Sequence, residues 1–367
     1  MKIIIATDAW EPQTNGVVTT LKATIETLGR LGHEVRVISP QGMPSIPAPS
    51  YPEIRLAIAP GLHIARHVKS FRPQAIHIAT EGPIGLAMRR YCRRHRLPFT
   101  TSYHTRYPEY LRARWPIPLA VSYAWLRGFH NAAARTFVSS HSLKSQLAEK
   151  RFGELHLWRR GVNLECFRPL PASVPEPLAG LPRPFMAYMG RVAVEKNIEA
   201  FLGLDVPGTK VVIGNGPQRA ELMQRYPAAV FTGYRFGDEL AAMLGCADVF
   251  VFPSLTDTFG LAMIEALACG VPVAAFPVPG PIDVIEPGVT GVLNEDLAVA
   301  IHSALRLDRT VCAQRAKAFT WDAATEQFLA GLEPIPASAR AALSASGSAM
   351  IARKAASEQP SGAGDAN

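Results

Sequence analysis

Short apolar strand patterns that alternate with helix patterns constrain this chain more than any other feature of its sequence. In the first half, apolar runs are separated by stretches with helical periodicity; the runs cover residues 2–7, 33–40, 75–80, 99–104 and 135–140. Strands that alternate with helices predict a parallel sheet covered by helices on both faces.

The pattern restarts after a proline-rich stretch at residues 165–184, which has the composition of a linker. A second series of apolar runs covers residues 185–190, 210–216, 229–234, 247–253 and 271–276. We therefore expect two doubly wound, Rossmann-like α/β domains, residues 1–168 and 169–335, with ligands between the carboxyl ends of their strands. Residues 336–367 are dominated by Ala, Ser and Gly and are expected to form a disordered tail.

The composition is that of a globular protein, with 48% hydrophobic and 19% charged residues. No apolar run is long enough for a membrane-spanning helix, and the first residues lack the cleavage region of a signal peptide. The five cysteines are scattered without metal-ligand spacing, which is typical of free thiols in a reducing cytosol. Residues 1–170 hold 24 Lys/Arg and 10 Asp/Glu, a net charge of +14, whereas residues 171–367 carry −6. The basic half should therefore bind an anionic partner.

Two acids stand out in the segment PSLTDTFGLAMIEALACGVPV, residues 253–273. Glu265 is the one charged residue between Thr258 and Ile282, in an apolar helix pattern, and Asp257 precedes it by eight positions in the expected loop. A lone carboxylate in apolar surroundings needs a partner or a ligand. Glu265 is at a distance along the helix that suits ribose hydroxyls, and Asp257 could hold the hydroxyls of a sugar. A structural ion pair between Glu265 and an arginine is the alternative.

The same segment and an earlier loop predict a phosphate site. Gly260 lets a ligand approach the backbone, and the N–H groups of Phe259, Gly260 and Leu261 at the helix start suit phosphate oxygens. Arg191 and Lys196 follow an apolar run of the same domain, so both side chains could reach one diphosphate.

Taken in order, these motifs resemble the retaining GT-B glycosyltransferases of family 4. The resemblance spans roughly residues 1–330, and the motifs that carry it are Gly190-Arg191, Lys196-Asn197, Gly214-Asn215-Gly216-Pro217, residues 253–273 and residues 279–293. It implies that Glu265 holds the ribose, that Asp257 contacts the donor sugar, and that Arg191 and Lys196 bind the diphosphate. The family pattern is Glu-x7-Glu, whereas this chain has Asp-x7-Glu, in a form similar to a lipid-glycosylating subgroup.

The resemblance also gives roles to two residues of the first domain. Gly16, in the turn that opens a helix, would bring its N–H to the β-phosphate, although Asn15 replaces one of the two glycines that the family often has. His104, at the end of a strand, would contact the donor sugar as a catalytic residue. From sequence pattern alone, Gly16 could simply shape a turn and His104 could be structural.

Two basic stretches in the first domain point to the acceptor. Residues 86–98 contain Arg89, Arg90, Arg93, Arg94 and Arg96. Residues 110–130 mix arginines with aromatic residues, namely Arg112, Arg114, Arg127, Trp115, Tyr123, Trp125 and Phe129. Arginines beside aromatic side chains fit an anionic membrane surface, and a solvated face is the alternative. No nucleic-acid-binding motif is present, so nucleic acid is not an expected partner.

The sequence thus predicts a retaining hexosyltransferase that uses a UDP- or GDP-sugar, needs no obligatory cofactor or metal, and acts at the cytosolic face of the membrane as a peripheral protein. Its acceptor would be a lipid or lipid-linked molecule. The alternatives are a transferase for a polysaccharide or other soluble acceptor, and a non-catalytic nucleotide-sugar-binding protein.

Overall fold

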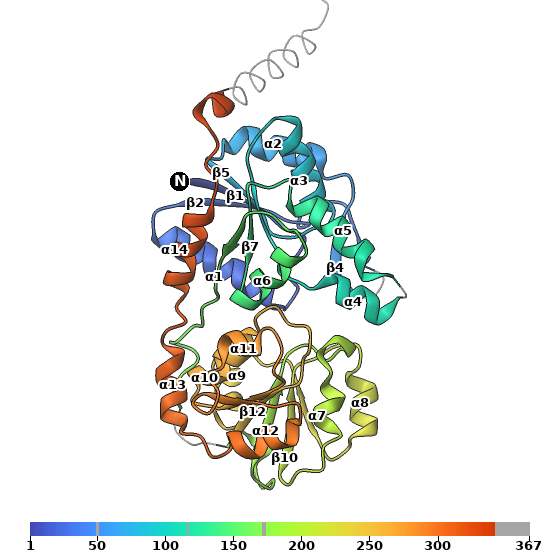
Figure 1. Ribbon diagram of the computed structural model, residues 1–367, viewed down its shortest axis with the longest axis vertical. Coiled ribbons are helices and arrows are strands. Elements are labelled where there is room, and N and C mark those ends of the chain that lie inside the picture. Colours follow the sequence, from blue (N-terminus) through green and yellow to red (C-terminus); the bar gives the residue numbers. More distant parts are fainter. Residues whose placement is uncertain (49–50, 116, 171–173, 342–367) are drawn as a thin grey trace, which may run out of the picture.

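The computed structural model describes residues 1–48, 51–115, 117–170 and 174–341, which form two stacked α/β domains (Figure 1). The first domain is built on a parallel sheet with the order β2-β1-β5-β6-β7-β8. Its strands are β1 (Lys2–Ala6), β2 (Glu34–Ile38), β5 (Ala75–Ile78), β6 (Thr100–Ser102), β7 (Arg135–Val138) and β8 (Leu155–Leu157). The helices between them are α1 (Gly16–Arg30), α2 (Gly61–Phe71), α3 (Pro83–Arg94), α4 (Tyr107–Arg114), α5 (Leu119–His130) and α6 (His141–Glu149). An antiparallel pair, β3 (Ser45–Ala48) and β4 (Tyr51–Ala57), lies outside this sheet.

The second domain has a parallel sheet with the order β11-β10-β9-β12-β13-β14. Its strands are β9 (Phe185–Met189), β10 (Thr209–Ile213), β11 (Val230–Gly233), β12 (Val249–Phe252), β13 (Val273–Ala275) and β14 (Gly291–Leu293). Its helices are α7 (Ile198–Leu202), α8 (Arg219–Arg225), α9 (Gly237–Gly245), α10 (Leu261–Ala268), α11 (Pro281–Val284), α12 (Leu297–Ala304) and α13 (Arg309–Ala316), with the 3₁₀ turns η1 (Glu176–Leu178) and η2 (Val194–Lys196). The expectation of two doubly wound parallel-sheet domains is confirmed.

The strands are buried because helices cover both faces of each sheet. In β1, Ile4 packs into the core on one side of the sheet, and Ile3 and Ile5 pack into the core on the other. In β9, Ala187 and Tyr188 likewise lie in separate cores. Continuous apolar runs are therefore needed in these strands, as in parallel sheets generally.

The last long helix, α14 (Trp321–Gly331), returns to the first domain (Figure 1). It packs against α1 and β8, its Phe328 is fully buried in the first domain's core, and Asp322 pairs with Arg30 at 2.7 Å. The sequence prediction had assigned residues up to 335 to the second domain. A helical pattern reveals an apolar face but does not say which core receives it.

Residues 337–341, at the start of the expected tail, are helical, and residues 342–367 lie outside the described ranges.

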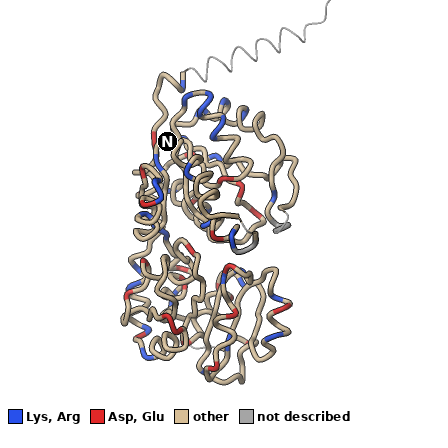
Figure 2. Tube along the Cα trace, turned by 45° about the vertical axis from the view of Figure 1, so that its right-hand side comes forward, with Lys and Arg blue, Asp and Glu red and all other residues tan. Residues whose placement is uncertain are grey.

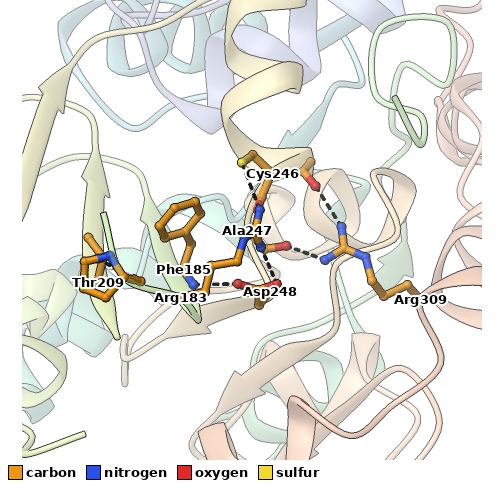
Figure 3. Close-up of polar contacts among 9 residues, drawn as sticks. Arg183, Phe185, Thr209, Cys246, Ala247, Asp248 and Arg309 are labelled. Carbon is orange, nitrogen blue, oxygen red and sulfur yellow. Dashed lines mark hydrogen bonds and ion pairs between the residues drawn. The ribbon is translucent and has the colours of Figure 1, made fainter. Parts of the chain in front are cut away.

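Two arginines hold the amino-terminal ends of strands in the second sheet (Figure 3). The candidate site is at the carboxyl ends of these strands. Arg183 pairs with Asp248 at 2.6 Å, and the other carboxylate oxygen of Asp248 accepts the N–H of Phe185 at 2.6 Å. Arg309 on α13 donates to the carbonyls of Gly245 and Ala247, which end α9 and precede β12. These bonds join β9, β12, α9 and α13 where no ligand is expected.

Two smaller expectations concern the whole chain. All five cysteines are free thiols. Across the described ranges, no helix has both the length and the apolar character that crossing a membrane requires.

Candidate active site

The candidate site lies at the switch point of the second sheet. Strand order reverses between β9 and β12, so the loops that follow these two strands diverge to opposite sides of the sheet and leave room for a ligand. After β9 come Gly190 and the turn η2, and after β12 comes the loop to α10. Asn197, in the left-handed conformation, donates from its side chain to the carbonyl of Pro253 at 3.1 Å and so ties the two loops together.

Lys196 and Asp257 meet between these loops. The Lys196 Nζ lies 2.5 Å from Asp257 Oδ1, and both side chains are largely buried, with exposed fractions of 19% and 17%. Burial opposes the charge of Lys196, but Asp257 and the neighbouring Tyr110 and Tyr188 outweigh it and raise the pKa of Lys196 above its usual range. The second carboxylate oxygen, Asp257 Oδ2, is buried and has no hydrogen-bond partner among the described residues. A buried acceptor without a partner is suited to a ligand hydroxyl.

The helix α10 begins with an uncapped N-terminus. Gly260 precedes it with φ of 88°, in the left-handed region that glycine adopts without strain, and a Cβ there would come within 2.9 Å of Phe252 Cζ. No side chain caps the helix, and the N–H groups of Phe259, Gly260 and Leu261 donate to no residue in the described part of the chain. Free amides at the positive end of a helix dipole form an anion site. The Phe259 side chain itself is buried in the core.

Glu265 is on α10, one turn beyond Leu261. Burial raises the pKa of the Glu265 carboxyl to about 7. Among the described residues, no arginine or lysine pairs with it, so the structural ion pair that was the alternative interpretation is not found. The carboxylate therefore has hydrogen-bonding capacity available for a ligand.

The first domain brings His104 and Gly16 to the same region. The Thr258 hydroxyl donates to the His104 carbonyl at 2.9 Å, and the Ser139 hydroxyl donates to the Thr258 carbonyl at 2.8 Å, so the loops after β6 and β7 hold the loop after β12. A Cβ on Gly16 would lie 3.3 Å from Leu261 Cδ1, so the start of α1 faces the start of α10 across the domain boundary. His104 Nε2 is buried, and no residue in the described ranges hydrogen-bonds to it.

Arg191 and the glycines of residues 214–216 complete the loop after β9. Arg191 accepts at its carbonyl from the Tyr188 hydroxyl at 2.8 Å, which fixes the backbone where its side chain emerges. A Cβ on Gly214 would lie 1.9 Å from the Gly190 carbonyl oxygen, and one on Gly216 would lie 2.3 Å from that of Val192. These two glycines allow two loops of the site to pack together.

Sequence reasoning missed three groups near the site. Arg160, 5% exposed, donates from Nη2 to His104 Nδ1 at 3.1 Å. Tyr110 on α4 hydrogen-bonds Thr256, and the charges of Lys196 and Asp257, on the other domain, act on its hydroxyl. Asp8, after β1, accepts from Thr80 and from the amides of Ile84 and Gly85 at the start of α3. An acid directly after the first strand was a usable signal for Asp8; the other two depend on distant contacts.

Asp8 has a second buried acid beside it at the switch point of the first sheet. Burial raises the pKa of Asp8, and the charge of Glu81 adds to this rise. Glu81 in turn lies 3.0 Å from His130 Nε2. Within the described residues, no group of three or more His, Cys, Asp or Glu side chains is placed to hold a metal ion.

The basic stretches of the first domain form part of its outer surface. Charged residues of this domain are visible in Figure 2. On α3, Leu86, Arg90 and Arg93 are exposed, and on α5, Val121 and Trp125 are exposed; we call these five residues the α3–α5 face. Arg89 joins the two helices, because its guanidinium donates to the carbonyls of Gly128 and Phe129 at 2.7 and 3.1 Å.

Not every residue predicted for that surface is on it. Tyr123 and Phe129 are buried and belong to the core, and Arg127 donates to the carbonyl of Lys150. Arg112 and Trp115 are exposed, and the side chain of Arg114 is outside the described part. Helical periodicity separates inward from outward positions only when the apolar face is distinct, and on α5 aromatic residues occupy both sides.

Two Rossmann-like domains that face each other form the architecture of the GT-B fold. The structure resembles sucrose-phosphate synthase from Thermosynechococcus elongatus with a TM-score of 0.69 and 21% identity, over 89% of this chain and 97% of that one. This likeness concerns the fold.

Sequence similarity then gives the family. Residues 14–166 match Glycosyltransferase Family 4, and residues 183–307 match Glycosyl transferases group 1. A GDP-mannose-dependent alpha-mannosyltransferase of Mycobacterium tuberculosis is 31% identical over 80% of this chain and 83% of its own length. An alpha-monoglucosyldiacylglycerol synthase of Streptococcus pneumoniae is 27% identical over 83% of this chain and 78% of its own length. The chain belongs to the family 4 glycosyltransferases and is an enzyme of that class.

Proposed function

We propose that this enzyme transfers a hexose from a UDP- or GDP-sugar to a lipid or lipid-linked acceptor, with retention of configuration, at the cytosolic face of the membrane. The observation that carries the proposal is the uncapped helix N-terminus at Gly260 together with the Glu265 carboxylate one turn further along α10, which pairs with no described cation. Two relatives support the two substrate classes, one named for GDP-mannose and one for a diacylglycerol product.

The donor nucleotide fits this helix in one direction. Diphosphate oxygens would accept from the amides at Gly260 and Leu261, with Arg191, Lys196 and the N–H of Gly16 nearby. Four residues of helix rise by about 6 Å, so the Glu265 carboxylate would meet the ribose hydroxyls next to that diphosphate. Each hydrogen bond to the ionised carboxylate would favour its charged form.

The chemistry would rest on stabilising the leaving group. Negative charge grows on the diphosphate as the bond to the sugar breaks, and preorganised amides with the Lys196 cation stabilise it. The buried Asp257 Oδ2 and His104 Nε2 would bind hydroxyls of the donor sugar. The contacts of Thr258 with His104 and Ser139 would keep the domains together and exclude water during transfer.

The α3–α5 face supports a membrane-bound acceptor. Arginines beside an exposed tryptophan suit the interface of an anionic bilayer, where each basic residue contributes about 1 kcal/mol. The face belongs to the same domain as Asp8 and Glu81, whose buried carboxylates at the first switch point could accept from an acceptor hydroxyl. A lipid bound there would present its head group to the cleft between domains.

A donor screen tests the proposal. The purified protein is incubated with GDP-mannose or UDP-glucose and a membrane lipid extract, and products are identified by mass spectrometry. We expect a glycosylated lipid with one of the two donors.

Lys196→Ala should reduce turnover by about a hundredfold or more, as removal of a transition-state donor does elsewhere. Lys317→Ala, an exposed lysine on the same domain, is the control. The unfolding temperature of both variants shows whether the fold persists. Near-normal transfer by folded Lys196→Ala would refute its role.

A further inference from the structure

We propose that Arg160 is a positioning residue that fixes the proton of His104 on Nε2, so that the imidazole presents a neutral N–H donor to the site. The inference rests on the proposed function, in which His104 meets the donor sugar. Arg160 follows β8 in the segment that leads to the second domain, and no sequence motif considered above includes it.

The guanidinium of Arg160 is held rigidly. Its Nη1 donates to the carbonyl of Trp158 at 2.6 Å and to that of Arg159 at 3.3 Å, and the group stacks over the Trp158 ring at 4.5 Å. Trp158 is itself fully buried. The next residue is pressed against α14, because a Cβ on Gly161 would lie 2.5 Å from the Trp321 nitrogen. The arginine therefore has one orientation available.

That orientation decides the tautomer of His104. Arg160 Nη2 lies 3.1 Å from His104 Nδ1, and a guanidinium has donors but no acceptor. Nδ1 must then accept, so the proton of the neutral ring sits on Nε2. That nitrogen is buried and has no hydrogen-bond partner within the described chain. The Nε2–H group therefore has no acceptor among the described residues, while Nδ1 is held by Arg160.

The surroundings also keep the ring neutral. Burial lowers the pKa of His104 well below its usual value, and the positive charge of Arg160 lowers it further, with smaller effects of His77 and His130. Arg160 makes no ion pair with a described carboxylate, so its charge is not cancelled locally. Burial lowers the pKa of Arg160 to about 9, so it remains protonated at neutral pH. The two ring nitrogens of His77 hydrogen-bond the hydroxyls of Thr100 and Ser102. Burial lowers the pKa of His77 to about 3.

The consequence is a defined recognition group. With Nε2–H, His104 donates one hydrogen bond to a sugar oxygen, whereas the other tautomer would present a lone pair and demand a hydroxyl hydrogen. Because the ring carries no charge, it would not draw the diphosphate away from the helix α10. Arg160 would thus act on the sugar through His104 without touching it.

The test uses the full-length protein labelled with ¹⁵N-histidine. Long-range ¹⁵N–¹H spectra report which ring nitrogen carries the proton, and the His104 signal is assigned by its loss in His104→Ala. We expect His104 to carry its proton on Nε2 from pH 5.5 to 8. In Arg160→Met, the tautomers should mix and the pKa of the ring should rise, although burial should still hold it below its usual value. Arg160→Lys keeps a cationic donor and should restore the Nε2–H form at least in part, and it remains informative if Arg160→Met does not fold.

Arg159→Met is the matched control, since Arg159 is the exposed neighbouring arginine and contacts His141 at 3.2 Å. It should leave the His104 signals unchanged. A proton on Nδ1 in the wild type, or an unchanged tautomer in Arg160→Met, would overturn the proposal.

Kinetics give a second readout once a donor and acceptor are known. Arg160→Met should lower kcat/KM about tenfold at pH 7 and move any loss of activity through protonation of His104 to higher pH, but it should have little further effect in a His104→Ala background. Additive losses in that double variant would contradict action through His104. Should no transfer be found with any donor, the proposed function fails while the tautomer result stands by itself.

Discussion

At the scale of the residue, Glu265 affects both the folding stability of the protein and the proposed nucleotide site. Its pKa is raised from 4.5 to about 7 by burial. At pH below 4.5 it is protonated in both the folded and the unfolded protein; as the pH rises toward 7 the unfolded form ionises first, so the folded protein loses stability over that window. We predict that Glu265→Gln stabilises the protein by about 2 kcal/mol at pH 8 and has little effect at pH 4.5.

The same substitution should weaken binding of the nucleotide about tenfold or more, because a ribose hydroxyl loses a charged acceptor. Urea unfolding at the two pH values and calorimetric titration with GDP and UDP measure both effects. Glu326→Gln, at an exposed acid on α14, should change neither. A variant that loses stability at pH 8, or that binds nucleotide as well as the wild type, would remove Glu265 from the proposed site.

The sequence could predict residues whose chemistry conflicts with their local surroundings. Glu265 is an acid in an apolar helix, and Gly260 precedes that helix where a phosphate-binding turn would need it. Arg160 could not be found this way, because it is one of many arginines in its half and acts through a contact with His104, 56 positions away. The same holds for Tyr110, whose partners lie on the other domain. The role of Tyr110 arises only when the domains come together, and that of Arg160 only when the strands of the first domain pack side by side.

At the scale of the element, a contact between the N-terminus of α6 and a carboxylate on α11 connects the two domains. Asp283 on α11 accepts from the backbone N–H of Ser142 at 2.9 Å and from its hydroxyl, at the start of α6 in the first domain. A carboxylate at the positive end of a helix dipole is stabilising. We predict that Asp283→Ala loosens the closed arrangement, seen as a larger radius of gyration in solution scattering, and raises the donor KM by about fivefold to tenfold, because the donor must then select a less populated form.

Asp296→Ala is the matched control, since Asp296 caps α12 through the amides of Ala298 and Val299 within one domain. It should lower the unfolding temperature without changing the radius of gyration. If both variants behave alike, Asp283 supports only its own domain and does not control closure.

Elements with strong apolar runs were predictable, and short edge elements were not. The runs at residues 2–7 and 185–190 became β1 and β9, in the interior of their sheets, where burial on both faces demands continuous apolar residues. β8 and β14, at the edges, have three residues each and partial burial, so no run marks them. The helix α14 was visible as a pattern, but its place on the first domain depends on the fully buried Phe328 and the pair of Asp322 with Arg30.

At the scale of the whole molecule, charge is divided between the domains. The first half carries +14 and the second −6. The two halves therefore differ in what they attract: a basic outer surface suits anionic lipid, while the proposed donor site has two cations, Arg191 and Lys196, within an acidic half. Under the proposed function, this division would let the enzyme lie against a membrane through one domain and leave the other free to exchange nucleotide.

This division predicts how the enzyme binds vesicles. It should co-sediment with vesicles that contain phosphatidylglycerol and much less with pure phosphatidylcholine, and binding should fall with added salt.

Arg90→Gln with Arg93→Gln, two exposed arginines of the α3–α5 face, should reduce binding about tenfold or more, at about 1 kcal/mol each. Trp125→Ser should reduce it with little change in the salt dependence, because the lost contribution is apolar. The paired control is Arg306→Gln with Arg315→Gln, two exposed arginines on the second domain, which should bind as the wild type does. Equal losses in both arginine pairs would mean that net charge, and not this face, attracts the enzyme to lipid.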